Sequence, residues 1–330
     1  GSVTVNADNS GQTVTQGSTS TPDEAPVITQ RGSSAETSNT ITINASENAT
    51  ANVTISDVNI NTSDAAVFTK GKGNVNIELD GTNTLKSSNW HAGLEKNNDG
   101  KLTITDKNEN GKLIATGSRY GAGIGGGNQR NGSNITITGG EITAIGGYSG
   151  AGIGGGNYKD GNDINIAGGK VTATGGDYGA GIGGGNQGNG KNITITGGEV
   201  TAAGGTNGAG IGGGLRKEGE KITVSGDATL KVQGGSGDGW DGAGAGIGNG
   251  GNHNGEFSGS FIPVNAAETE PDTSNLTTGK IEYYAPGADM TKDEPTSTIL
   301  GSGQPASPGE TAAPVEYRMQ TSASEPVQGN

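Results

Sequence analysis

Short segments in which apolar and polar residues alternate recur along most of the chain, separated by turns rich in Gly and Asn. One set of these segments repeats the pattern Ile-Thr-Ile-Thr or a close variant, with its first apolar residue at Ile135, Ile164, Ile193 and Ile222. A second set follows each of these segments and contains Ile142, Val171 and Val200. Because side chains alternate between the two faces of a strand, a period of two predicts β-strands.

A third segment in each repeat is rich in glycine. The sequence GAGIGGG occupies residues 121–127, 150–156, 179–185 and 208–214, and the variant GAGIGNG occupies 244–250. The first three steps are 29 residues long and the last is 36. Each repeat therefore contains three short segments between turns, which is what one coil of a three-faced β-helix requires.

Stacking the repeats aligns their apolar residues into inward-facing columns. One column contains Ile124, Ile153, Ile182, Ile211 and Ile247, and two others contain the residues named above. Adjacent coils of such a fold lie ~4.8 Å apart, so these β-branched side chains would pack continuously. The pattern predicts an all-β, right-handed parallel β-helix, a three-faced solenoid of about seven coils with ~29-residue repeats in its centre.

The repeat also predicts how the chain is divided. Residues 1–38 are expected to form an N-terminal lead-in or cap, and 39–255 the parallel β-helix, whose earlier coils are degraded copies around Leu94 and Leu102. Residues 256–300 are expected to cap the last coil through Phe257, Phe261 and the segment 281–284, and 301–330 to form a linker or tail. The longer last step is explained by one residue inserted near Ala228 and by a longer loop at 236–242.

Composition alone would suggest disorder, but the periodicity argues against it. Leu, Ile, Val and Phe make up about 16% of the chain, and the net charge is −14. A solenoid buries only one row of side chains per face, so it needs few apolar residues. The acidic balance argues against nucleic acid as a partner. No apolar run approaches the ~18 residues of a spanning helix, so membrane insertion of this fragment is not expected.

The GAGIGGG blocks, with Asn-Ile-Thr-Ile-Thr-Gly-Gly between them, resemble the Gly-rich repeats of Gram-positive cell-surface proteins. The resemblance covers roughly residues 40–255 and also includes the upstream coils at 79–87 and 101–105. It implies an extracellular, cell-surface location and a carbohydrate-binding or adhesin-like role, and it assigns no catalytic residues. Any signal peptide or wall attachment would lie outside this fragment.

Aromatic residues mark one corner of the predicted coils. Trp90, Tyr120 and Tyr178 each stand two residues before the Ala of a Gly-rich block, and Tyr148 stands one position earlier in its coil. His91 follows Trp90, and Trp240 lies in the inserted loop at the same corner. A row of aromatic rings can hold an extended sugar polymer, with Asn and Thr bonding its hydroxyl groups. The alternative is that these rings stack on one another for stability.

Two further groups of charged residues are candidates for a catalytic site and a calcium site. Glu141, Lys170 and Glu199 share one column, and two carboxylates two coils apart have the separation of an inverting glycosidase. Lys170 lies between them, so a surface ion-pair ladder is the simpler account. Asp238 and Asp241, in a Gly/Asp-rich loop, could bind calcium, although solvated turns explain the same residues. No cofactor other than possible calcium is expected.

Three functions follow from these observations. The first is an extracellular surface module that binds carbohydrate, or another host or cell-surface ligand, along the aromatic corner. The second is a non-catalytic stalk or adhesin scaffold. The third, a polysaccharide lyase or glycoside hydrolase, rests on fold analogy, and the two histidines lie in different coils with no sequence context that nominates a nucleophile.

Overall fold

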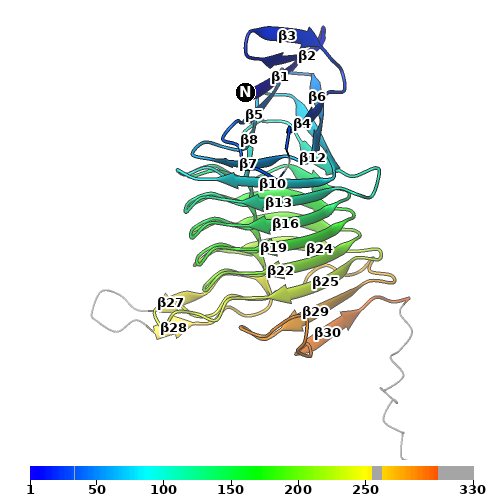
Figure 1. Ribbon diagram of the computed structural model, residues 1–330. Helices are drawn as coiled ribbons and strands as arrows, with labels where there is room; N and C mark the ends of the chain where they lie inside the picture. Colours follow the sequence, from blue (N-terminus) through cyan, green and yellow to red (C-terminus); the bar gives the residue numbers. More distant parts are fainter. Residues whose placement is uncertain (33, 255–261, 304–330) are drawn as a thin grey trace, which may run out of the picture.

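The chain folds into a solenoid of β-strands (Figure 1). The computed structural model describes residues 1–32, 34–254 and 262–303 of the 330, and these residues form strands and turns without a helix. Parallel strands stack in three long sheets around about seven turns. The predicted all-β parallel β-helix is confirmed.

Three sheets form the walls of the solenoid. The first is 11-stranded and contains β1 (Val3–Asp8), β2 (Gly11–Gln16), β3 (Thr19–Pro22), β5 (Ile41–Ala45), β8 (Val67–Lys70), β11 (Leu94–Lys96), β14 (Ile124–Gly125), β17 (Ile153–Gly154), β20 (Ile182–Gly183), β23 (Ile211–Gly212) and β26 (Ile247–Gly248). The second is 8-stranded and contains β4 (Val27–Thr29), β6 (Thr50–Ser56), β9 (Asn74–Asp80), β12 (Leu102–Thr105), β15 (Ile135–Ile137), β18 (Gly161–Ile166), β21 (Gly190–Ile195) and β24 (Gly219–Val224). The third is 9-stranded and contains β7 (Asn59–Thr62), β10 (Thr82–Ser87), β13 (Lys112–Thr116), β16 (Glu141–Ile145), β19 (Lys170–Thr174), β22 (Glu199–Ala203), β25 (Thr229–Gln233), β29 (Lys280–Tyr284) and β30 (Ser297–Leu300). A separate two-stranded sheet pairs β27 (Asn252–Asn254) with β28 (Ile262–Val264).

The strand register matches the columns expected from the repeat. Ile124 pairs with Ile153 in the first sheet, and Ile135 pairs with Ile164 in the second. The degraded earlier coil is also in register, since Leu94 pairs with Ile124. Glu199 pairs with Thr229, one residue beyond the regular step, which confirms the insertion predicted near Ala228.

A single continuous hydrophobic core runs along the inside of the solenoid. It extends from Val5 in β1 to Ile281 in β29, and the isoleucines of the central columns are fully buried. Each buried aliphatic side chain contributes roughly 1.5–3 kcal/mol relative to exposure. Since each coil adds its own row of these side chains, stability accumulates along the stack.

Antiparallel strands end the parallel stack on both sides. At the N-terminal end β1 stacks parallel on β5, and β2 and β3 add to it antiparallel. At the other end β29 stacks parallel on β25 and is followed by antiparallel β30. The segment 281–284 therefore covers the last coil as expected, whereas Phe257, Phe261 and the tail beyond residue 303 lie outside the described residues.

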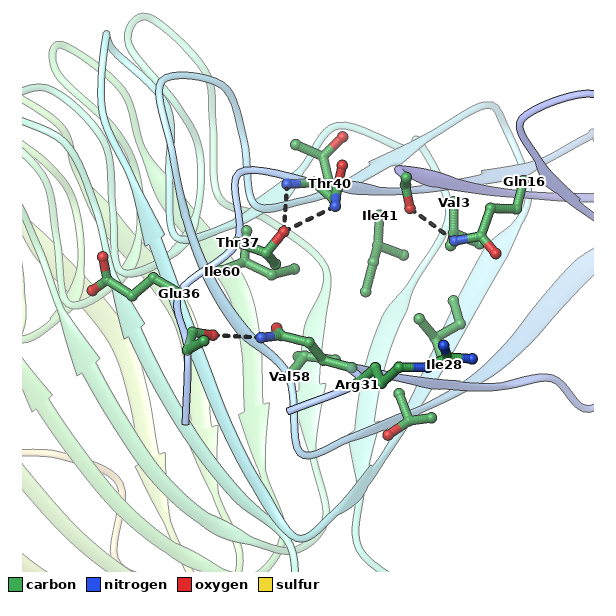
Figure 2. A pocket seen from close by; sticks show the side chains of 15 residues that line it. Val3, Gln16, Ile28, Arg31, Glu36, Thr37, Thr40, Ile41, Val58 and Ile60 are labelled. Carbon is green, nitrogen blue, oxygen red and sulfur yellow. Dashed lines mark hydrogen bonds between the residues drawn. The ribbon is translucent and has the colours of Figure 1, made fainter. Parts of the chain in front are cut away.

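The N-terminal end of the core opens into a hollow of about 790 Å³ (Figure 2). Apolar side chains from the first coils line it, namely Val3, Ile28, Ile41, Val58 and Ile60. Gln16 closes one side, with its side-chain amide donating to the carbonyl of Gly1 at 2.8 Å.

Glycine is required where coils approach most closely. Gly154 has a φ of 135°, and a Cβ at this position would lie 2.0 Å from the carbonyl oxygen of Gly183 in the next coil. Gly125 and Gly183 have the same conformation and the same close contact with the glycine one coil further on. Any larger residue would therefore meet both backbone strain and a steric clash.

We expect Gly154→Ala to lower the free energy of unfolding by about 3 kcal/mol or more, because the methyl group must push two coils apart. Chemical denaturation followed by circular dichroism measures this. Thr174→Ala, at an exposed strand position, is the control and should stay within about 0.5 kcal/mol of the wild type. Equal stability of the two variants would contradict the requirement for glycine.

Candidate functional site: an aromatic corner

One corner of the solenoid brings together residues from two successive coils. We call Trp90, Tyr120, Ser149, Tyr178 and Asn207 the corner column, because they occupy equivalent positions before each Gly-rich strand. The Gly-rich segment that follows each of these residues is buried. Where the segment ends, the chain lies beside the corner residue of the preceding coil. Backbone hydrogen bonds join the two, from Asn128 to the carbonyl of Trp90 at 2.7 Å and from Asn157 to that of Tyr120 at 2.9 Å.

Trp90 is the most unusual residue of the corner column. Its side chain is 64% exposed, and its backbone φ is 83°. A bulky residue seldom adopts this left-handed conformation, which costs of order 1–3 kcal/mol. Strain of this kind concentrates at binding sites, so Trp90 is the leading candidate for a ligand contact.

The tyrosines in the middle of the corner contact one another. Tyr148 and Tyr178 pack edge to face with ring centroids 4.9 Å apart, and their hydroxyl groups are 3.0 Å apart. The hydrogen bond with Tyr148 raises the pKa of Tyr178 to about 12. The Arg119 guanidinium lies 5.5 Å from the Tyr120 ring and 5.4 Å from the Tyr148 ring. In the middle of the row the aromatic side chains therefore pack on one another, which is the alternative to ligand binding. Tyr148 is still 40% exposed.

The structure adds an aromatic residue that the sequence analysis missed. Tyr158 is 53% exposed and follows Asn157, whose backbone bonds to Tyr120. It belongs to a second column, which we call the turn column and which contains Gln129, Tyr158, Gln187 and Arg216. All four residues have positive φ angles. The backbone bonds between coils show that this column adjoins the corner column, a relation that sequence spacing alone does not give.

A ladder of asparagine side chains supports this corner from inside. The Asn157 amide donates to Asn128 at 3.2 Å, and the Asn186 amide donates to Asn157 at 3.1 Å. Leu215 takes the next position, so the ladder ends there. These amide groups bond to one another along the stack and so stabilise the turn.

Beside Trp90, His91 pairs with a buried carboxylate. Its Nδ1 lies 2.7 Å from Glu95 Oε2, and the backbone amide of Ala92 donates to the same oxygen at 3.1 Å. Glu95 stands where the next coil has Gly125. The Glu95 side chain thus accepts the hydrogen bond of the Ala92 amide. In the next coil the equivalent amide, of Ala122, donates to the main-chain carbonyl of Gly126 instead. The Glu95 carboxylate also orients His91 next to Trp90.

The predicted calcium residues have protein partners. The buried Asp241 carboxylate accepts two hydrogen bonds from Arg216, at 2.7 and 2.8 Å, and lies 2.8 Å from His253 Nδ1. Burial alone would raise the pKa of Asp241, but the bonds from Arg216 and His253 outweigh it and lower the pKa. Asp238 accepts from the backbone amides of Trp240 and Asp241 and closes the loop. The described residues contain no cluster of three or more metal-ligating side chains of the His, Cys, Asp or Glu type.

The charged column on the third sheet is a surface ladder. Glu141, Lys170 and Glu199 are in register, but Glu141 forms its ion pair with Lys112 of the preceding coil, at 3.0 Å. A shallow hollow of about 390 Å³ contains Glu141 and Lys170 but is not lined by Glu199. The two carboxylates therefore do not flank a common cleft.

A third hollow, of about 330 Å³, lies beside the corner and contains a buried lysine. Lys96 ends β11, and its ammonium donates to the carbonyl of Asn98 at 2.5 Å. Burial lowers the pKa of Lys96 from 10.5 to about 8, and the nearby charge of Asp99 acts in the opposite direction. Arg130 and Lys159 line the same hollow.

Comparison with known proteins agrees with this architecture. The profile of the family described as "Beta helix repeat" matches residues 109–128, 135–157, 164–186 and 193–215. The chain contains a β-helix repeat region. The search of curated proteins found no match, and neither did the search of solved structures. The described residues include no helix long and apolar enough to cross a membrane.

We expect Lys96→Met to raise the free energy of unfolding at pH 7 by roughly 2 kcal/mol, because it removes a desolvated charge. The lowered pKa means that the native state releases its proton near pH 8 and the unfolded state only near pH 10.5. Wild-type stability should therefore rise with pH across this window, and the advantage of the variant should shrink. Denaturant titrations at pH 7 and 10 test this. If Lys96→Met were more stable than the wild type by the same amount at pH 7 and pH 10, the charge of Lys96 would not be the cause of the difference.

We expect Asp241→Asn to lower the free energy of unfolding at pH 7 by about 3 kcal/mol, because it leaves Arg216 and His253 without their buried carboxylate. Because the pKa of Asp241 is lowered in the native state, its ionised carboxylate stabilises the fold at every pH above the ordinary carboxyl pKa. This stabilisation is lost as the pH falls through the pKa of the folded state. The difference from wild type should accordingly narrow in acid. Asp64→Asn, at an exposed position, is the matched control, and an equal loss in both variants would contradict the role of Asp241.

Proposed function

We propose that this chain is an extracellular, non-catalytic binding module that recognises carbohydrate along the aromatic corner. The observation that carries the proposal is Trp90, an exposed indole held in a strained backbone conformation at the edge of a regular surface. A flat apolar ring suits the C–H face of a sugar, and its neighbours supply polar groups for hydroxyl groups.

The arrangement of the corner supports an extended ligand. Trp90, Tyr120 and Tyr178 lie on coils spaced ~4.8 Å apart, so their positions follow the axis of the solenoid. Tyr158 and Gln129 border the same line from the turn column. Trp240, 64% exposed, extends it at the far end, where His253 and Asp241 lie close to its loop.

The structural stalk is the second candidate function, and a specific observation favours it. The contacts of Arg119, Tyr148 and Tyr178 with one another satisfy these side chains without a ligand. A stalk and a binding module differ in Trp90: its exposure and strained backbone are of no use to a stalk, whereas an exposed indole would contribute most to sugar binding.

We expect the purified domain to bind oligosaccharides on a glycan array, and Trp90→Ala to weaken the best binding tenfold or more, which corresponds to about 1.4 kcal/mol. Isothermal titration calorimetry measures the loss. Ile145→Ala removes a large exposed side chain from the third sheet and should leave the affinity unchanged. Runs with and without calcium also test the prediction of calcium at Asp238 and Asp241.

If the folded wild-type domain binds no glycan on the array, the stalk is favoured. Binding that survives Trp90→Ala but is lost in Tyr158→Ala would move the site to the turn column. Circular dichroism of each variant keeps loss of binding distinct from loss of structure.

A further inference from the structure

Three cationic side chains from successive coils line one hollow beside the corner column. Lys96 comes from the end of β11, and Arg130 and Lys159 come from the turns of the next two coils. Asp99 is the one carboxylate that lines the hollow with them. In a chain of net charge −14, this is a local excess of positive charge.

Among the described residues, none of the three cations forms an ion pair. Asp99 interacts favourably with the charge of Lys96 but forms no ion pair with it. Amide side chains, including those of Gln129 and Asn131, complete the lining and offer neutral hydrogen-bond donors. The set of groups is suited to a ligand that carries a negative charge and several oxygen atoms.

The positions of these cations are unfavourable without a ligand. Gly156 donates to the carbonyl of Arg130 at 3.1 Å, and Lys159 donates to that of Gly156 at 3.1 Å, so Arg130 and Lys159 follow one another up the stack. Like charges at equivalent positions of adjacent turns repel each other. Lys96 adds a third charge that is largely withdrawn from water, and it uses one of its three N–H donors on Asn98.

The hollow adjoins the leading residue of the carbohydrate site. Asn128, two residues before Arg130, is hydrogen-bonded through its backbone amide to the carbonyl of Trp90. A sugar ring on Trp90 would therefore lie next to the turn that bears Arg130. We propose that this hollow binds the anionic substituent of an acidic glycan, a carboxylate or an ester sulfate or phosphate, whose sugar ring lies on Trp90. This inference rests on the proposed function.

The proposal has a consequence for pH. An anion is bound by the charged form of Lys96, whose pKa burial lowers to about 8. The charged groups around it include the buried Glu95 of the same strand and Asp99 in the same turn. They also include Arg130 and Lys159 in the next coils, and Lys70 at the end of β8, the strand paired with β11. Affinity for the acidic glycan should thus fall as the pH rises from 7 to 9, while affinity for a neutral glycan should not.

The test compares a galacturonic acid oligomer with the same oligomer after methyl esterification, which keeps the sugar and removes the charge. A sulfated oligosaccharide distinguishes carboxylate from sulfate as the bound group, and single-stranded DNA of equal charge controls for any polyanion. Calorimetry at low salt uses the wild-type chain and the variants Lys96→Met, Arg130→Gln and Lys159→Gln. Lys86→Gln, on the exposed face of β10, removes the same charge elsewhere.

We expect an acidic oligomer to bind at least about tenfold more tightly than the ester, and each variant of the hollow to reduce this binding roughly fivefold. Lys86→Gln should have no effect, and ester binding should not change in any of these variants. Equal binding of acid and ester, both lost in Trp90→Ala, would overturn this inference and leave the proposed function intact. Absence of binding to either would count against both, and DNA binding as tight as that of the acid would overturn the assignment to a glycan.

Discussion

The close approach of main chains in the Gly-rich columns is the constraint on which the whole structure depends. At Gly154 the space that a Cβ would occupy is taken by a carbonyl oxygen of the next coil. This approach lets each Gly-rich segment lie inside the wall with its isoleucine turned into the core. The high glycine content of the chain is therefore a requirement of close packing, since no other residue fits these positions.

The constant rise between coils converts sequence positions into straight columns on the surface. Each Gly-rich segment is buried, and the residue that follows it bonds to the corner residue of the preceding coil. The turn column therefore lies beside the corner column. Trp90 with Gln129 and Tyr120 with Tyr158 are placed together in this way. A surface built from such pairs is regular along the axis, and changes of single residues alter its chemistry without altering its geometry.

The fold could be predicted from the sequence because its determinant, the inward apolar column, is local and periodic. The site could be predicted only in part. Trp90, Tyr148 and Trp240 were identified as exposed aromatics, whereas Tyr158 depends on a contact between coils that spacing does not show. Arg216 and His253 stand 25 and 12 residues from Asp241, and only folding brings them to it. Nothing in the sequence around Glu95 and Lys96 shows that the fold buries both charged side chains.

The described chain enters the stack at one end and leaves it at the other (Figure 1). Tension applied between these two ends acts along the axis and across the strands, so it loads the hydrogen bonds of one coil at a time. A released central coil of 29 residues would lengthen the chain by ~100 Å. Under such a load the stack would therefore lengthen in steps of one coil.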